Sequence, residues 1–142
     1  MSWLAPVNRE PPQPDLSQAR RIHQIVKLRP EHYEAYKKCH AEVWPEVLEQ
    51  IKRSNIVDYS ISYDPGSSLL FASFKYVGKD FEADMQKTRE HGPTRQWWSM
   101  TDGYQESINP GAVSSEKGGT VGKDGKKISS WWKQCEELFY VP

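Results

Sequence analysis

Two strand-like runs joined by a short turn constrain the fold of this chain most strongly. In residues 56–64, IVDYSISYD, apolar or aromatic side chains alternate with polar ones, and this period of two is typical of a half-buried strand. The alternation places one set of side chains on a common face: Val57, Tyr59, Ile61 and Tyr63. After the turn sequence PGSS, residues 69–77, LLFASFKYV, form a second apolar run. The two runs therefore predict an antiparallel hairpin.

The second run is largely apolar on both of its faces. Helices can cover one face of a sheet, but the other face then needs its own partner. The simplest partner is the same face of an identical subunit, because two sheets that pack face to face bury both surfaces. We therefore predict a homodimer whose sheets face each other.

The remaining elements follow from the same periodicities and from proline and glycine breaks. The pattern predicts further strands over 21–29 and 137–142, and helices over 31–54, 79–90 and 94–108. Within the first of these strands, Ile22, Val26 and Leu28 share one face. With the hairpin, the order becomes β-α-β-β-α-β, which is the ferredoxin-like plan of an α+β domain.

We assign a single domain to residues 20–142 and a separate arm to residues 1–19. The arm holds four of the ten prolines and few side chains that could be buried, so it is either disordered or docks Trp3 and Leu4 on the body. Residues 110–130 are rich in Gly, Ser and Lys. They predict a long surface loop, which is either an active-site lid or a tolerated insertion.

Composition narrows the classes of partner. The chain has 19 basic and 19 acidic residues, so no basic excess exists to neutralise phosphates, and we expect no nucleic-acid partner. No apolar run reaches the length of a signal-peptide core or the roughly 20 residues of a membrane span, so we expect no membrane association. Cys39 and Cys135 lack metal-ligand or CxxC spacing and are interpreted as reduced thiols. These features predict a cytoplasmic location.

The helical segment over 31–54 carries a stripe in which Tyr36, His40 and Trp44 follow one another at one-turn spacing. Pro45 cannot bond back to the preceding turn and disfavours helical geometry at Trp44, so we predict a kink or restart just after His40. An inward histidine is usually a satisfied core residue, but beside hydroxyl and aromatic groups it can also exchange protons near neutral pH. Cys39 is not expected to pair with His40, because neighbours on a helix point apart.

The adjacent pair Trp97 and Trp98 is the second candidate feature. Neighbours on a helix point about 100° apart, so one ring could fill the core and the other an interface. Alternatively the pair forms a wall for a ligand with an apolar face, such as a sugar. The second tryptophan pair, 131–132, is expected to be mainly structural. The sequence has no H-x-H, HExxH or Cys/His cluster, so we predict no metal site.

Five segments carry a resemblance to a known family: YKKCHAEVWPEV, DYSISYD, LLFASF, QWW followed by MTD, and the terminal LFYVP. In this order and at these distances they resemble the L-rhamnose mutarotase family. The resemblance extends from about residue 21 to residue 142, apart from the loop over 110–130, which looks longer than usual. The MTD also follows the tryptophan pair one residue earlier than in the family. The resemblance implies a ferredoxin-like domain that dimerises sheet to sheet into an α/β barrel.

The resemblance also implies an isomerase that needs no cofactor. It would interconvert the α and β anomers of L-rhamnose, or of a closely related sugar, by acid–base-assisted opening and closure of the ring. By position, His40 is the acid and Tyr36 its partner. The sugar contacts would come from Tyr59, Trp97 and Trp98, with Trp44 beside them. A dimeric ferredoxin-like binding protein and a cofactor-free monooxygenase or lyase remain as alternatives, because one fold hosts many functions.

Overall fold

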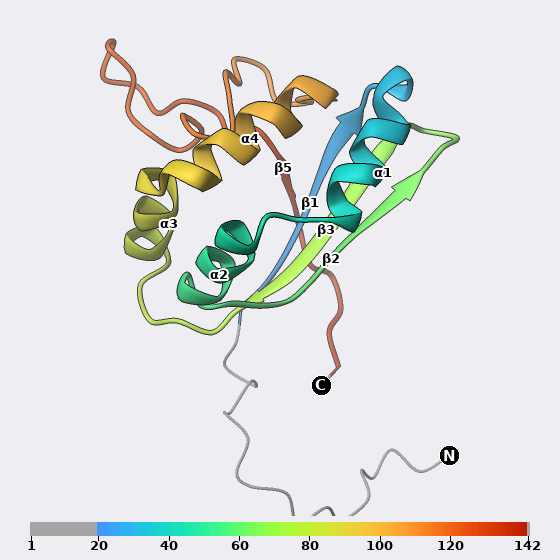
Figure 1. The fold of residues 1–142 in the computed structure, drawn as a ribbon. Coiled ribbons are helices and arrows are strands. Elements are labelled where there is room, and N and C mark those ends of the chain that lie inside the picture. The colour runs from blue at the N-terminus through green and yellow to red at the C-terminus, as the bar shows by residue number, and fades with distance from the viewer. Residues whose placement is uncertain (1–19, 142) are drawn as a thin grey trace, which may run out of the picture.

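An antiparallel sheet forms the centre of the chain (Figure 1). This computed structural model describes residues 20–141, so the arm predicted over 1–19 lies outside the described residues. The strands are β1 (Arg20–Leu28), β2 (Ile56–Asp64), β3 (Leu69–Tyr76), β4 (Gln105–Glu106) and β5 (Lys133–Cys135). Their order is β2-β3-β1-β4, and β5 also pairs with β1. The predicted hairpin is therefore confirmed as the pair β2–β3.

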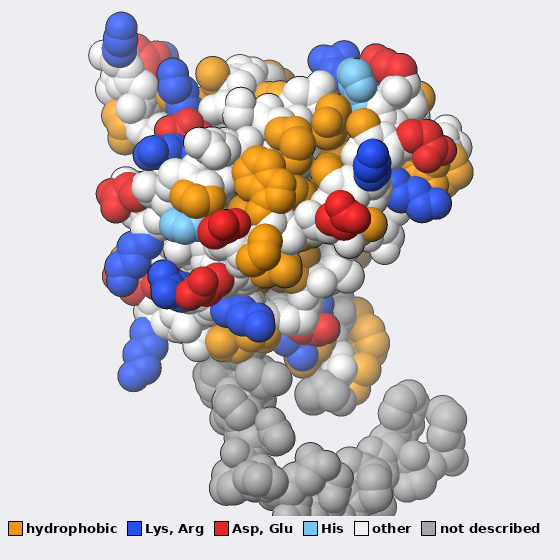
Figure 2. Space-filling view, in the orientation of Figure 1, with side chains coloured by type: hydrophobic (Ala, Val, Ile, Leu, Met, Phe, Trp, Pro, Cys, Tyr) orange, Lys and Arg blue, Asp and Glu red, His pale blue; other side chains and the backbone are white. Residues whose placement is uncertain are grey.

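The helices lie together on one face of this sheet, which we call the helix-bearing face (Figure 1). They are the 3-10 helix η2 (Pro30–His32) and the α-helices α1 (Tyr33–Ala41), α2 (Pro45–Arg53), α3 (Phe81–Glu90) and α4 (Gly92–Tyr104). Figure 2 shows hydrophobic side chains gathered near the middle of this side of the molecule, with charged side chains around them. The mixed α+β class predicted from the sequence is confirmed.

Two clusters of buried side chains join the helices to the sheet. The first contains Ile22, Ile56, Phe74 and Tyr76, against which Ile51, Phe81 and Met85 pack. The second contains Val26, Leu28, Tyr36 and Leu70, with aromatic residues of β2, α4 and the segment before β5 around it. The shared face predicted for Ile22, Val26 and Leu28 is confirmed, since all three are buried. The second cluster places α1 directly over the sheet.

A bulge in β2 changes which of its side chains face the helices. The pairing of β2 with β3 shifts between Val57 and Ser60, and Asp58 has a φ of +52°, a left-handed conformation that Asp tolerates better than most residues. Ile61 pairs with Ala72, which is buried, whereas Val57 pairs with Lys75. The prediction that Val57 shares a face with Tyr59 and Ile61 is therefore wrong.

Two predicted element boundaries are also wrong. The last strand lies at Lys133–Cys135, and residues 136–141 form no strand, although 137–142 was predicted as one. The helix predicted over 94–108 begins earlier and ends at Tyr104, after which Gln105 enters the sheet. It begins at Gly92 because Pro93 suits the first turn of a helix and the His91 side chain accepts a hydrogen bond from the Thr94 N–H.

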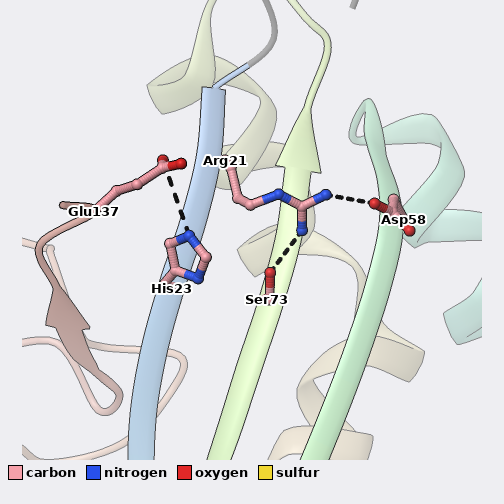
Figure 3. A network of polar contacts seen from close by, with 5 residues as sticks. All are labelled: Arg21, His23, Asp58, Ser73 and Glu137. Atoms are coloured by element: carbon pink, nitrogen blue, oxygen red, sulfur yellow. Dashed lines mark hydrogen bonds and ion pairs between the residues drawn. The ribbon is translucent and has the colours of Figure 1, made fainter. Parts of the chain in front are cut away.

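The other face of the sheet carries no helix, and we call it the open face. Figure 3 shows Arg21, His23, Asp58, Ser73 and Glu137 on it. Arg21 donates hydrogen bonds to Asp58 (2.5 Å) and to Ser73 (2.6 Å), and His23 lies 3.9 Å from Glu137. Phe71 projects from the same face as Ser73 and is 44% exposed. The open face therefore mixes internally paired charges with exposed apolar surface.

The segment between α4 and β5 is held to the body at its base. Asp102 of α4 accepts hydrogen bonds from the backbone N–H (2.8 Å) and hydroxyl (2.5 Å) of Ser115, and the Asn109 amide donates to the carbonyl of Ser130. Near its tip, Val121 and Lys127 form an isolated antiparallel bridge. The predicted loop over 110–130 thus has defined contacts with α4. Across residues 20–141, no helix has the length and apolar character that crossing a membrane requires.

Candidate active site

A cleft of about 1250 Å³ opens between α1, α2 and β2. Tyr36 and His40 line it from α1, Val47 lines it from α2, and Tyr59 lines it from β2. Trp97 of α4 completes the lining. The structure therefore brings together four of the six site residues predicted from the sequence, which come from three separate segments of the chain.

The break between α1 and α2 shapes this cleft. Helix α1 ends at Ala41, and Trp44 is extended, with φ −58° and ψ 132°. Pro45 then occupies the first turn of α2, where its missing N–H costs nothing and its fixed φ suits the helix. The predicted restart just after His40 is confirmed. Because the two helices are separate, the end of α1 leaves His40 at the side of the cleft.

Hydrogen bonding determines which nitrogen of His40 carries the proton. Nδ1 lies 2.9 Å from the backbone carbonyl oxygen of Tyr36, and a carbonyl can only accept. Nδ1 therefore donates, and in the neutral ring Nε2 is left unprotonated. Burial lowers the pKa of His40, and the hydrogen bond to the Tyr36 carbonyl opposes this effect. The neutral ring is thus favoured relative to a histidine in water.

Cys39 approaches His40 more closely than the sequence predicted. Its sulfur lies 3.3 Å from Nδ1 of His40 and 3.2 Å from the carbonyl oxygen of Tyr36. The expectation that the two neighbours would not meet is wrong, because both side chains turn back to the same carbonyl. Burial raises the pKa of the Cys39 thiol. The group is therefore a protonated thiol at neutral pH and not a thiolate nucleophile.

Two tyrosines line the cleft together with the histidine. The rings of Tyr36 and His40 stack with centroids 4.2 Å apart. Burial, with a smaller effect of the nearby Tyr59, raises the pKa of Tyr36 above its ordinary value, and a hydrogen bond from Gln105 opposes the shift. Desolvation also raises the pKa of Tyr59 to about 12, although the residue as a whole is 40% exposed, and its ring stacks on Phe74 with centroids 5.2 Å apart. Both hydroxyls therefore stay protonated at neutral pH and can donate hydrogen bonds.

The tryptophans take separate places. The Trp97 ring is 6% exposed and meets His40 edge to face at 5.3 Å. The ring of Trp44 meets that of Trp97 edge to face with centroids 5.2 Å apart, and Trp44 does not itself line the cleft. Trp98 lines a second cavity of about 580 Å³ beneath α3, α4 and the long loop. The two cavities share Val47, Ile51, Ile56, Tyr59 and Trp97, so they adjoin at Trp97 and Tyr59.

Two residues touch this site from behind: sequence reasoning missed Gln105 and expected Trp131 to be mainly structural. Gln105 donates a hydrogen bond to the hydroxyl of Tyr36 at 3.1 Å. It accepts one from the indole N–H of Trp131 at 2.9 Å. No local pattern marks either residue, since the partners lie 69 and 26 positions away in the chain. The one usable signal was the high tryptophan content, because a buried indole N–H needs an acceptor.

The geometry defines a class of site. A histidine with one free ring nitrogen lies beside two protonated phenols and an indole wall, and such groups can move a proton on a small polar molecule that has an apolar face. Residues 20–141 contain no group of three or more His, Cys, Asp or Glu side chains placed to hold a metal ion. The fold and site together are those of a small α+β protein with an acid–base cleft.

Comparison with known proteins narrows the class of protein further. A family model described as L-rhamnose mutarotase matches residues 21–141. An L-rhamnose mutarotase from Listeria monocytogenes is 37% identical over 78 residues, which cover 55% of this chain and 72% of the relative. One from Burkholderia ambifaria is 32% identical over 89 residues, which cover 63% and 83% of the two chains.

A solved structure is similar as well. The crystal structure of an L-rhamnose mutarotase from Formosa agariphila superposes with a TM-score of 0.60 at 23% identity, covering 87% of this chain and 99% of that one. This similarity supports the α+β fold described above. The chain belongs to the L-rhamnose mutarotase family, and the resemblance inferred from the sequence motifs is confirmed.

Proposed function

We propose that this protein catalyses the mutarotation of L-rhamnose in the cleft around His40. The observation that carries the proposal is the meeting of Tyr36, His40, Tyr59 and Trp97 in one cleft, in a chain that belongs to the L-rhamnose mutarotase family. An aldose with a flat apolar side and several hydroxyls suits a cleft with one indole wall and two phenols.

The reaction needs two proton movements. Opening the hemiacetal ring requires a proton delivered to the ring oxygen and one removed from the anomeric hydroxyl, and closure on the other face of the aldehyde reverses both. In its imidazolium form His40 supplies the proton from Nε2, since Nδ1 is held by the carbonyl of Tyr36, and water takes up the proton of the anomeric hydroxyl. The imidazole then takes the proton back as the ring closes. A positioned acid of this kind contributes about 10²–10⁴-fold.

The aromatic residues hold the sugar while its C1–C2 bond rotates. Trp97 offers the apolar wall, and Tyr36 and Tyr59 offer hydroxyls to the sugar oxygens. Trp98 extends the contact surface into the adjoining cavity. Trp44 contributes by backing Trp97, because the two rings meet at 5.2 Å. No step in this scheme requires a cofactor.

We also propose the finer architecture predicted from the sequence. The strand order β2-β3-β1-β4 with helices on one face supports a single ferredoxin-like domain over 20–142. Two such domains would pair open face to open face as a homodimeric α/β barrel. Arg21 is already paired with Asp58, so burial of the open face would leave neither charge unpaired. Free Cys39 and Cys135 support a cytoplasmic location.

Polarimetry tests the activity and its substrate range. Crystalline L-rhamnose is dissolved with and without the protein, and the change in optical rotation is followed, with L-fucose, L-lyxose and D-mannose in parallel. We expect the protein to accelerate the mutarotation of L-rhamnose most strongly. If the protein accelerates the mutarotation of none of the four sugars, the proposal is overturned. If it accelerates another sugar more strongly, L-rhamnose is not its preferred substrate.

A further inference from the structure

Gln105 lies directly behind Tyr36 and outside the cleft. It is the first residue of β4, where its Cα pairs with Leu28 of β1, and it is 3% exposed. Gln105 is not among the described residues that line either cavity. Its side-chain amide bridges the Tyr36 hydroxyl and the Trp131 indole. Gln105 therefore cannot touch a molecule in the cleft, but it touches a residue that does.

The chemistry of the indole fixes the direction of the amide. An indole N–H can only donate, so the group that faces it must be the Gln105 carbonyl oxygen, here at 2.9 Å. The amide nitrogen then has to face Tyr36, and it donates to the phenol oxygen at 3.1 Å. The reversed amide would set N–H against N–H at the indole. The two contacts therefore have one consistent orientation.

The direction of this bond decides the role of Tyr36. Because its oxygen accepts from Gln105, the single hydroxyl proton of Tyr36 is free to point away from Gln105. Within residues 20–141 Gln105 is the side-chain partner of the Tyr36 hydroxyl, and Tyr36 lines the cleft beside His40. Burial raises the pKa of Tyr36, so the hydroxyl keeps its proton at neutral pH and acts as a hydrogen-bond donor.

Trp131 reaches this position from the end of the long loop. The Ser107 hydroxyl donates to the carbonyl of Trp131 at 2.5 Å, and the Asn109 amide donates to the carbonyl of Ser130 at 2.8 Å. These contacts hold the chain on both sides of the loop together next to β4. The loop base thus supplies the indole that orients the amide of Gln105.

We infer that Gln105, oriented by Trp131, is a positioning residue that aims the Tyr36 hydroxyl proton into the cleft, where it donates to an oxygen of the bound sugar. The inference rests on the proposed function for the identity of that sugar. The hydrogen-bond direction itself does not depend on the function. It assigns Tyr36 a donor role and leaves proton transfer to His40.

Gln105→Glu tests the direction of the bond. A carboxylate still accepts from Trp131, but it also accepts from Tyr36 and so turns the phenol proton away from the cleft. We expect the kcat/KM for L-rhamnose anomer exchange to fall about tenfold, the usual effect of one lost hydrogen bond. Trp131→Phe, which frees the amide to rotate, should lower it less. Gln86→Glu on the exposed surface of α3 is the matched control and should leave exchange unchanged.

A double-mutant cycle with Tyr36→Phe separates positioning from general stability. If Gln105 acts through the phenol, Gln105→Glu causes no further loss of exchange once the hydroxyl is gone. An equal tenfold loss in both backgrounds, or exchange within about twofold of wild type in Gln105→Glu alone, would overturn the inference. Thermal melting of each variant shows whether it is folded, and Gln105→Asn serves if Gln105→Glu does not fold.

A spectroscopic readout remains decisive even if the wild-type protein shows no exchange on L-rhamnose, which would overturn the proposed function alone. The ¹³Cζ resonance of Tyr36, assigned by its loss in Tyr36→Phe, reports whether the phenol oxygen accepts or donates. We expect this resonance to shift in Gln105→Glu and in Trp131→Phe, but not in Gln86→Glu. An unchanged Tyr36 resonance in Gln105→Glu would overturn the inference independently of any activity.

Discussion

At the scale of single residues, His40 owes its chemistry to the carbonyl of Tyr36. The 2.9 Å contact fixes the proton on Nδ1, and the position of the ring beside Trp97 desolvates it. The same backbone carbonyl therefore sets the tautomer of His40, the acid that we propose, and holds the imidazole next to the Tyr36 ring. Desolvation and hydrogen bonding act in opposite directions on its pKa, and desolvation is the larger effect.

The lowered pKa of His40 predicts a pH dependence. The pKa of His40 lies below its ordinary value of 6.5, so only a small fraction of His40 is imidazolium near neutral pH. This fraction grows about tenfold for each pH unit of acidification. If the imidazolium protonates the ring oxygen, the kcat/KM for anomer exchange, corrected for the uncatalysed rate, rises as the pH falls from 8 to 6. Exchange NMR measures it. A kcat/KM that instead rises with pH would show that the neutral ring acts first as a base.

At the scale of elements, the restart at Pro45 separates α1 from α2. Pro45→Ala leaves the sequence free to continue the helix through Trp44 and adds conformational freedom to the unfolded chain. We expect the free energy of unfolding in urea to fall by about 0.5–1 kcal/mol and anomer exchange to fall with it. Pro93→Ala, in the first turn of α4, is the comparison that should affect stability alone. A Pro45→Ala protein that is more stable than wild type and equally active would contradict this role.

The contact between Asp102 and Ser115 predicts how the long loop is held. The carboxylate accepts two hydrogen bonds from Ser115, whereas Asp102→Asn places an N–H₂ group against one of these donors. We expect trypsin to cleave the loop over 110–130 about fivefold faster in Asp102→Asn, as one hydrogen bond is lost. Mass spectrometry of the digest measures it. Glu106→Gln, exposed on β4, is the control, and equal cleavage of both variants would contradict the anchoring role.

Much of the element pattern could be predicted from the sequence, because it depends on local periodicity. The alternation of Ile22, Val26 and Leu28 and the geometry of Pro45 are local properties, and both predictions are confirmed. The bulge at Asp58 could not be predicted, since a left-handed Asp leaves no mark on the pattern. Strand β5 could not be either, because Lys133–Cys135 has no apolar alternation and forms by pairing with β1.

Some features of the site could also be predicted from the sequence, and others could not. His40 and Tyr36 lie one helical turn apart, so their stacking could be expected from spacing. The separation of Trp97 from Trp98 into adjoining cavities was open, because it depends on how α4 packs. Gln105 carries no local signal, and Trp131 was expected to be mainly structural, since their contacts join distant segments. The long-range support of the site is therefore what the sequence alone leaves undetermined.

At the scale of the whole molecule, the open face predicts the assembly. Phe71 is 44% exposed and Val57 is 38% exposed on it, and such apolar surface favours a partner. We expect light scattering to give twice the 16.5 kDa chain mass. Phe71→Glu should return the protein to a folded monomer, whereas Val121→Glu, on a loop residue that is 69% exposed, should remain dimeric. A monomeric wild-type protein would contradict the sheet-to-sheet dimer.

The central claim is that the His40 cleft catalyses the mutarotation of L-rhamnose. Two-dimensional exchange NMR at anomeric equilibrium measures it directly on wild type, on His40→Asn and on the control His32→Asn. His40→Asn keeps a side-chain donor near the place of Nδ1 but removes the titrating ring. The account predicts rapid exchange for wild type and His32→Asn, and a loss of about 10²–10⁴-fold in a folded His40→Asn. Wild-type exchange in His40→Asn would contradict it.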